Sequence, residues 1–184
     1  MELCGGVTVR FGGRAVLDNV TLTVPEKAVT WLSGESGVGK TTLLRVLAGL
    51  IVPEAGQVTL PGRGVMLFQE DRLFPRLSAL DQVLSVLPRQ RREEAKGWLE
   101  LVELADAAHL PPKKLSGGMA RRAALARALA VEGEVYLLDE PFAGVDLERA
   151  QRILGRLGGL GRTVVVTGHQ TELAGLCQHT VELN

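Results

Sequence analysis

The chain has 184 residues, enough for one domain with a sizeable apolar core, and 46% of them are hydrophobic. Its 21 basic and 21 acidic side chains cancel, so the sequence lacks the basic excess with which proteins neutralise nucleic-acid phosphates. The two cysteines, Cys4 and Cys177, are far apart in the sequence and predict neither a disulfide framework nor a zinc site.

No stretch of the sequence approaches the ~18 consecutive apolar residues that a membrane-spanning helix requires. Residues Met1 to Arg10 lack the basic region and apolar block of a secretory signal. We therefore expect a cytoplasmic protein that acts at a membrane only through other subunits.

The chain begins with two segments of alternating apolar and polar residues, Val7 to Phe11 and Val16 to Val24, separated by the turn Gly12 to Arg14. This pattern predicts two half-exposed antiparallel strands. A short apolar strand, Ala28 to Ser33, then leads into a glycine-rich segment, and a helix is expected over Lys40 to Leu50.

The rest of the chain alternates between predicted strands and helices. Buried apolar strands separated by helices predict an α/β fold with a mostly parallel sheet, helices on both of its faces, and a side sheet made by the first two strands. The further strands are predicted at 56–60, 64–68, 134–138, 162–167 and 179–183, and the further helices at 79–87, 91–104, 118–130, 148–157 and 172–176.

The segment GESGVGKT, Gly34 to Thr41, fits the phosphate-binding P-loop pattern. Glycines let the backbone curl so that successive N–H groups point at one phosphate, and the following helix brings its positive N-terminal end to the same place. Lys40 supplies a cation for the β- and γ-phosphates, and the Thr41 hydroxyl can bind magnesium. The segment therefore predicts a nucleotide phosphate site.

The segment VYLLDEP, Val135 to Pro141, places two adjacent carboxylates directly after an apolar strand. Ligands of open parallel sheets bind at this end of the strands. Asp139 is suited to hold magnesium, and Glu140 to orient or deprotonate an attacking water. A solvated strand end is the alternative, and the P-loop in the same chain favours catalysis.

Two other predicted strands also end in polar side chains, Gln69 after the one and His169 after the other. A single glutamine or histidine would more often be an ordinary turn residue. If the strands are parallel, however, both residues meet the P-loop and the carboxylates at one edge, where His169 can donate to the γ-phosphate.

The segment LSGGM, Leu115 to Met119, precedes an alanine-rich helix. Ser116 is suited to cap that helix, and Gly117 and Gly118 expose N–H groups at its start. The residues alone leave two interpretations open, a plain capped helix and a second anion site.

Taken in order, the P-loop, Gln69, LSGGM, LLDEP and His169 resemble the ATP-binding domain of ABC transporters over essentially the whole chain. The resemblance implies ATP and Mg²⁺ as ligands. It implies catalytic roles for Glu140, His169 and Lys40, and magnesium ligation by Thr41, Gln69 and Asp139. The nucleotide contacts that it implies are Phe11, which would stack on adenine, Gly34, Glu35, Ser36, Gly37, Val38, Gly39, Lys40, Thr41, Thr42 and Gln69, with Ser116, Gly117 and Gly118 contributed in trans by a second copy.

The same resemblance implies a P-loop NTPase core formed by a single domain, 1–184, with a shortened helical subdomain inserted at about 72–130. Its mechanism is a head-to-tail dimer that closes on two ATP molecules, with Gly144 and Asp146 at the seam, and reopens after hydrolysis. Three positions depart from the usual pattern: Phe11 stands for tyrosine, Met119 for glutamine and Gln170 for aspartate.

Among the functions of this family we expect an ATPase subunit of a transporter, and specifically an importer, docked on membrane permease subunits at the inner face of the cell membrane. Residues Gln69 to Val83 resemble the region after this glutamine in importers of nitrate and sulfonate type. They form either a docking groove or a plain surface loop. The charges of residues Arg89 to Lys96 predict a solvated helix face. A soluble ATPase in DNA repair or translation is the alternative, which the short P-loop-to-LSGGM interval and the single set of motifs disfavour.

Overall fold

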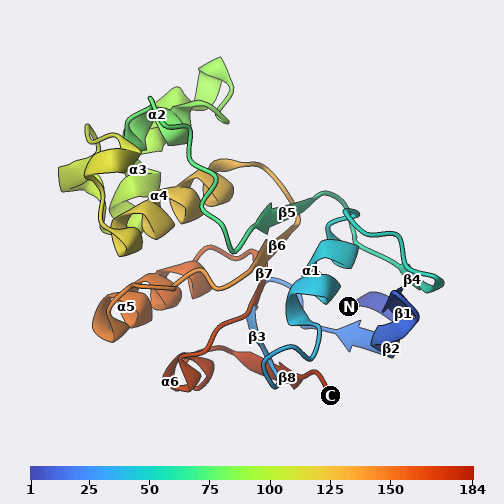
Figure 1. Ribbon diagram of the computed structural model, residues 1–184. Helices are drawn as coiled ribbons and strands as arrows, with labels where there is room; N and C mark the ends of the chain where they lie inside the picture. Colours follow the sequence, from blue (N-terminus) through green and yellow to red (C-terminus); the bar gives the residue numbers. More distant parts are fainter.

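Five parallel strands form the central sheet of the computed structural model, which describes residues 1–184 (Figure 1). All neighbouring strands are parallel, so their carboxyl ends share one edge. The predicted fold class is confirmed. In spatial order the strands are β5 (Gly64–Leu67), β6 (Val135–Leu138), β7 (Thr163–Val166), β3 (Val29–Ser33) and β8 (His179–Glu182).

A second sheet is antiparallel and contains the predicted N-terminal pair, β1 (Glu2–Phe11) and β2 (Arg14–Thr23). The strand β4 (Ala55–Val58) pairs with the other edge of β1, so this sheet has three strands rather than the two that the sequence predicted. β1 begins at Glu2 rather than at the predicted Val7. The residues before Val7 include the glycine pair Gly5 and Gly6, so they lack the apolar–polar alternation that predicts a strand. The structure pairs them with an irregularity around Gly6, whose φ is 63°.

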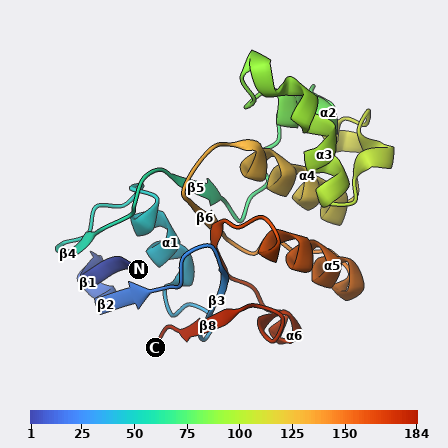
Figure 2. The same ribbon diagram turned by 180° about the vertical axis from the view of Figure 1, so that it is seen from behind.

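Alternate residues of the central strands face two different cores. Leu137 and Val165 point toward a core that contains helix α1 (Lys40–Leu47) and the antiparallel sheet. Tyr136 and Val166 point toward a larger core on the opposite face. The parallel sheet is therefore the middle layer, as the two opposite views show (Figures 1 and 2). The helices that contribute to the larger core are α2 (Ala79–Leu84), α3 (Ala95–Leu101), α4 (Gly117–Ala130), α5 (Leu147–Gly158) and α6 (Thr171–Ala174).

The helix predicted over 91–104 was wrong in its first part and in its last three residues, since α3 ends at Leu101. The structure has a 3-10 helix at Arg89–Glu94, followed by α3. The 3-10 segment buries no residue, so no apolar face favours an α-helix there. Its geometry instead aligns Arg91 with Glu94, whose side chains form an ion pair of 2.7 Å.

Other element ends follow local backbone chemistry. α1 ends at Leu47 rather than at the predicted Leu50, because Gly49 takes a left-handed φ of 71°. Two further 3-10 turns, Ala105–Ala107 and Pro112–Lys114, connect α3 to α4. None of the helices is long and apolar enough to cross a membrane.

Candidate functional site

The loop between β3 and α1 curls around the amine of Lys40. The Lys40 Nζ donates to the carbonyl oxygens of Gly34 at 2.6 Å and Glu35 at 2.8 Å. Gly39, with φ 113°, begins α1, and a Cβ there would lie 2.8 Å from the Val16 carbonyl oxygen. Only glycine fits this position. The loop thus places a cation and a helix N-terminus together, which is the arrangement that binds phosphate.

A cavity of about 290 Å³ opens over this loop. Three side chains from other strand ends reach it: Gln69 after β5, Glu140 after β6 and His169 after β7. The predicted meeting of strand ends at one edge is therefore observed. The loop and helix residues that line the cavity are Ser36, Gly37, Gly39, Lys40, Thr41 and Thr42, with Val16 from β2.

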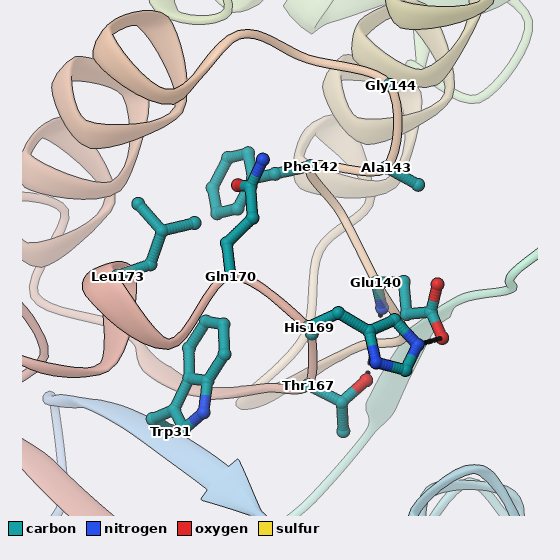
Figure 3. Close-up of a pocket in the computed structure, with 10 residues that line it drawn as sticks. Trp31, Glu140, Phe142, Ala143, Gly144, Thr167, His169, Gln170 and Leu173 are labelled. Atoms are coloured by element: carbon teal, nitrogen blue, oxygen red, sulfur yellow. Dashed lines mark hydrogen bonds and ion pairs between the residues drawn. The ribbon is translucent and has the colours of Figure 1, made fainter. Parts of the chain in front are cut away.

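The Glu140 carboxylate lies between the two other polar side chains. Its Oε1 is 3.1 Å from the His169 Nε2 and 3.4 Å from the Gln69 Nε2, which donates to it. Figure 3 shows the imidazole ring beside this carboxylate, on the wall of a pocket that continues toward Phe142 and Gly144. A carboxylate, an amide and an imidazole can here act on one small group above the phosphate loop.

Asp139 is buried, with 1% of its surface exposed. Its Oδ1 accepts a hydrogen bond of 2.8 Å from the Thr167 hydroxyl, whereas its Oδ2 has no partner. Leaving a buried carboxylate oxygen unpaired is costly, and a hard cation would satisfy it. Thr41 and Gln69 line the cavity over the P-loop, as does Glu140, the residue after Asp139, and they offer the hydroxyl and amide oxygens that such a cation also prefers. The residues present therefore fit a magnesium ion.

Phe11, at the end of β1, exposes 53% of its surface. It lines a groove between the antiparallel sheet and the P-loop, together with Gly37 and Val38. An aromatic face beside a phosphate loop is suited to stack on a planar ring.

Ser116 caps helix α4 as predicted, because its hydroxyl accepts a hydrogen bond of 3.3 Å from the Met119 N–H. None of Ser116 to Gly118 lines the cavity over the P-loop. In both views α4 begins at its end farther from α1 (Figures 1 and 2). The structure does not bring the LSGGM segment to the phosphate loop of its own chain.

The start of α4 packs instead on the segment after Glu140. A Cβ on Gly118 would lie 2.3 Å from the Gly144 carbonyl oxygen, so the two backbones are in contact. Asp146, a little further along, caps α5 by accepting a hydrogen bond of 3.0 Å from the Arg149 N–H. The two segments expected at a dimer seam are thus neighbours within one chain.

Sequence reasoning did not single out two residues behind the carboxylates, Arg121 and Thr167. Arg121 is 2% exposed and donates to backbone carbonyls on both sides of the site. Thr167, at the end of β7, contacts both carboxylate residues. The only hint in the sequence is an arginine pair in an alanine-rich helix and a hydroxyl ending a run of valines.

Comparisons with known proteins agree with this geometry. The family model described as ABC transporter matches residues 17–143. The chain is 48% identical over 157 residues to the aliphatic sulfonates import ATP-binding protein SsuB 1 of Nocardia farcinica, covering 84% of this chain but only 64% of that relative. It is 37% identical over 196 residues to the intermembrane phospholipid transport system ATP-binding protein MlaF of Escherichia coli (strain K12), covering 91% of this chain and 73% of the relative.

Among solved structures, the dimeric post-hydrolysis state of the ATP-binding cassette MJ0796, bound to ADP and Pi, matches with a TM-score of 0.87. The two chains are 29% identical, and the match covers 100% of this chain and 94% of that chain.

Proposed function

Because the chain belongs to the ABC transporter family, we propose that it binds and hydrolyses ATP as a subunit that powers a membrane transporter. The observation that carries this proposal is the gathering of Lys40, Gln69, Glu140 and His169 around one cavity from four separate strand ends. A triphosphate with its attacking water uses all four groups, whereas a plain phosphate site would need only the first.

In this proposal the P-loop binds the phosphates. Lys40 leaves its two carbonyl partners for the β- and γ-phosphate oxygens, and the loop N–H groups and the start of α1 supply the remaining positive field. Phe11 stacks on the adenine from its exposed position beside the loop. The residues proposed to contact the nucleotide from the loop itself are Gly34, Glu35, Ser36, Gly37, Val38, Gly39, Thr41 and Thr42.

Glu140 is the proposed general base. Its carboxylate orients the water that attacks the γ-phosphorus and accepts the proton from it. His169 donates to a γ-phosphate oxygen as negative charge develops. Thr41, Gln69 and Asp139 would hold a magnesium ion, which supplies charge neutralisation at the phosphate oxygens.

We propose that a second copy completes each site. Ser116 to Gly118 are outside the P-loop cavity of their own chain, so their free N–H groups can serve the γ-phosphate bound by a partner. The similarity to the dimeric cassette MJ0796 supports this arrangement. Gly144, in backbone contact with Gly118, would lie with Asp146 at the seam.

The partner of the dimer is proposed to be a pair of permease subunits at the cytoplasmic face of the membrane. The names of both reported relatives describe transport systems, which favours this role over DNA repair or translation. One name specifies import of sulfonates, which favours an importer. The other name specifies transport of phospholipids, so the two names differ in solute and we propose no particular one. The surface after Gln69, where Phe74 is 53% exposed, is the proposed docking region.

The direct test is to assay the purified protein for Mg²⁺-dependent release of phosphate from ATP. Lys40→Ala should abolish nucleotide binding, measured with a fluorescent ATP analogue, because it removes the phosphate cation. Lys96→Ala, an equal change on the exposed face of α3, is the matched control and should behave as wild type. Unchanged nucleotide binding by the Lys40→Ala variant would refute the proposed site.

A further inference from the structure

Glu140 has an unusual backbone conformation. Its φ is 50°, in the left-handed region that residues with a side chain rarely adopt, and it precedes a proline. Such conformations persist only where the surrounding structure holds them. At this position the backbone angle decides where the carboxylate points.

Thr167 holds the residue from the β7 side. The Glu140 N–H donates to the Thr167 hydroxyl at 3.1 Å, and that hydroxyl donates to the Asp139 Oδ1 at 2.8 Å. The threonine is 1% exposed, so water does not replace it easily. Figure 3 shows its hydroxyl directed at the backbone of Glu140. One hydroxyl therefore fixes both the amide of Glu140 and the carboxylate of Asp139.

Arg121 holds the same residue from the α4 side. Its Nε donates to the Glu140 carbonyl at 2.8 Å, and another of its nitrogens donates to the Asp139 carbonyl. The same guanidinium binds the carbonyls of Phe68 at 2.6 Å and Gln69 at 3.1 Å. The segments after β5 and β6, which carry the amide and the carboxylates of the site, are thus joined through one buried cation.

A purely structural ion pair does not account for Arg121. It does contact the Asp71 carboxylate at 3.1 Å, but four of its acceptors are carbonyls at the ends of strands β5 and β6. Arg122, the next residue, is also buried and donates to the carbonyls of Val102 and Glu103, away from the site. Adjacent arginines of one helix therefore serve two different regions.

We propose that Thr167 and Arg121 are positioning residues, which hold Glu140 in its left-handed conformation and so keep its carboxylate between Gln69 and His169. This inference rests on the proposed function, since it assigns these residues a role in ATP hydrolysis. Arg121 lies on the helix whose first residues are proposed to meet the ATP of the partner. A movement of α4 on dimer closure would therefore act directly on the base of its own chain.

The test compares Thr167→Val with Thr167→Ser. Valine matches the shape of threonine but leaves the Glu140 N–H and the Asp139 Oδ1 without their hydroxyl, whereas serine keeps it. We expect Thr167→Val to bind ATP as wild type does, because the P-loop is unchanged, and to lose about tenfold in kcat, with Thr167→Ser recovering most of the loss. Wild-type kcat in the valine variant would overturn the proposal.

A second pair of variants tests the other side and remains informative if Thr167→Val does not fold. Arg121→Lys, which cannot span all the carbonyl acceptors, should lower kcat by about tenfold with little change in KM. Arg122→Lys is the matched control on the same helix. It should keep the wild-type kcat, even if it lowers the melting temperature as much as Arg121→Lys does. Equal kcat values in the two lysine variants would contradict a positioning role for Arg121.

A double-mutant cycle separates this inference from the proposed function. If Thr167 acts through Glu140, adding Thr167→Val to Glu140→Gln should cause almost no further loss of kcat. A further loss of about tenfold in the double variant would mean that the threonine acts independently, and would overturn the inference alone. Absence of ATP hydrolysis by the wild-type chain would instead refute the proposed function, and with it the inference.

Discussion

Two carboxylates of this molecule, Glu103 and Glu140, have opposite environments. Glu103, two residues after the end of α3, forms ion pairs with Arg149 at 3.1 Å, Arg152 at 2.8 Å and Arg156 at 3.2 Å, all on α5. Glu140 has no arginine or lysine ion pair, and its carboxylate contacts only an amide at 3.4 Å and an imidazole at 3.1 Å. The charge of Glu103 is therefore paired within the protein, whereas Glu140 has no such partner and lines a cavity.

The difference separates a structural charge from the charge proposed to act in catalysis. Hydrogen bonds and ion pairs from the arginines lower the pKa of Glu103 to about 2, so this residue stays ionised and joins α3 to α5. The adjacent site carboxylate, Asp139, keeps a buried oxygen without a partner. A carboxylate that is to bind a ligand has few partners within the protein alone. Substituting Glu103 should therefore affect stability, and substituting Glu140 should affect activity.

The largest effect is expected from Glu140→Gln. The amide keeps the shape of the side chain but cannot accept the proton of the attacking water, so ATP hydrolysis should fall about a hundredfold or more. ATP affinity and thermal stability should change little, because the carboxylate makes no strong pair within the protein. Rapid hydrolysis by this variant in a phosphate-release assay would show that the base is misassigned.

The reverse pattern is expected from Glu103→Gln. Losing the charge that three arginines share should lower the free energy of unfolding by about 1–2 kcal/mol, a moderate value because these side chains are partly exposed. Urea denaturation at neutral pH measures this loss. The ATP affinity of the folded variant should equal that of wild type, and a large loss of affinity with unchanged stability would contradict the comparison.

The contribution of Glu103 should also depend on pH. Since the folded state lowers its pKa from the ordinary 4.5 to about 2, the ion pairs stabilise the protein fully above pH 4.5. The stabilisation is lost as the pH falls from 4.5 toward 2. The difference in unfolding free energy between wild type and Glu103→Gln should therefore be smaller at pH 3.5 than at pH 7. A difference that grows on acidification would contradict this assignment.

The smallest effect on stability is expected from removing an exposed ion pair. Arg10 and Glu54 join β1 to the start of β4 at 3.1 Å, but both side chains are close to half exposed. Solvent screening should limit the pair to under about 0.5 kcal/mol, so Glu54→Gln should barely move the denaturation midpoint. A loss as large as that of Glu103→Gln would show that burial does not govern the strength of these pairs.

The sequence predicted the parts of the site that depend on local pattern. The glycines and lysine of the P-loop are recognisable because adjacent residues must bind one phosphate. Gln69, Glu140 and His169 were expected to meet because each follows an apolar strand, and the parallel order of β5, β6, β7 and β3 brings them together.

The sequence did not predict the parts that depend on contacts between distant segments. Arg121 looked like one of many arginines on a helix, and only the packing of α4 against the strand ends reveals its carbonyl partners. Thr167 looked like the last residue of a strand. The 3-10 segment from Arg89 to Glu94 was mistaken for α-helix because its charges suit an exposed helix and no buried residue fixes the period.

In the proposed dimer each ATP site is completed by a second copy of the chain, since Ser116 to Gly118 lie outside the P-loop cavity of their own chain. The most direct test is light scattering on the Glu140→Gln variant, with and without saturating MgATP, because this variant should bind ATP without consuming it. A monomer that becomes a dimer only when ATP is present is the predicted result. A mass that stays monomeric in saturating ATP, with nucleotide binding verified in the same sample, would contradict it.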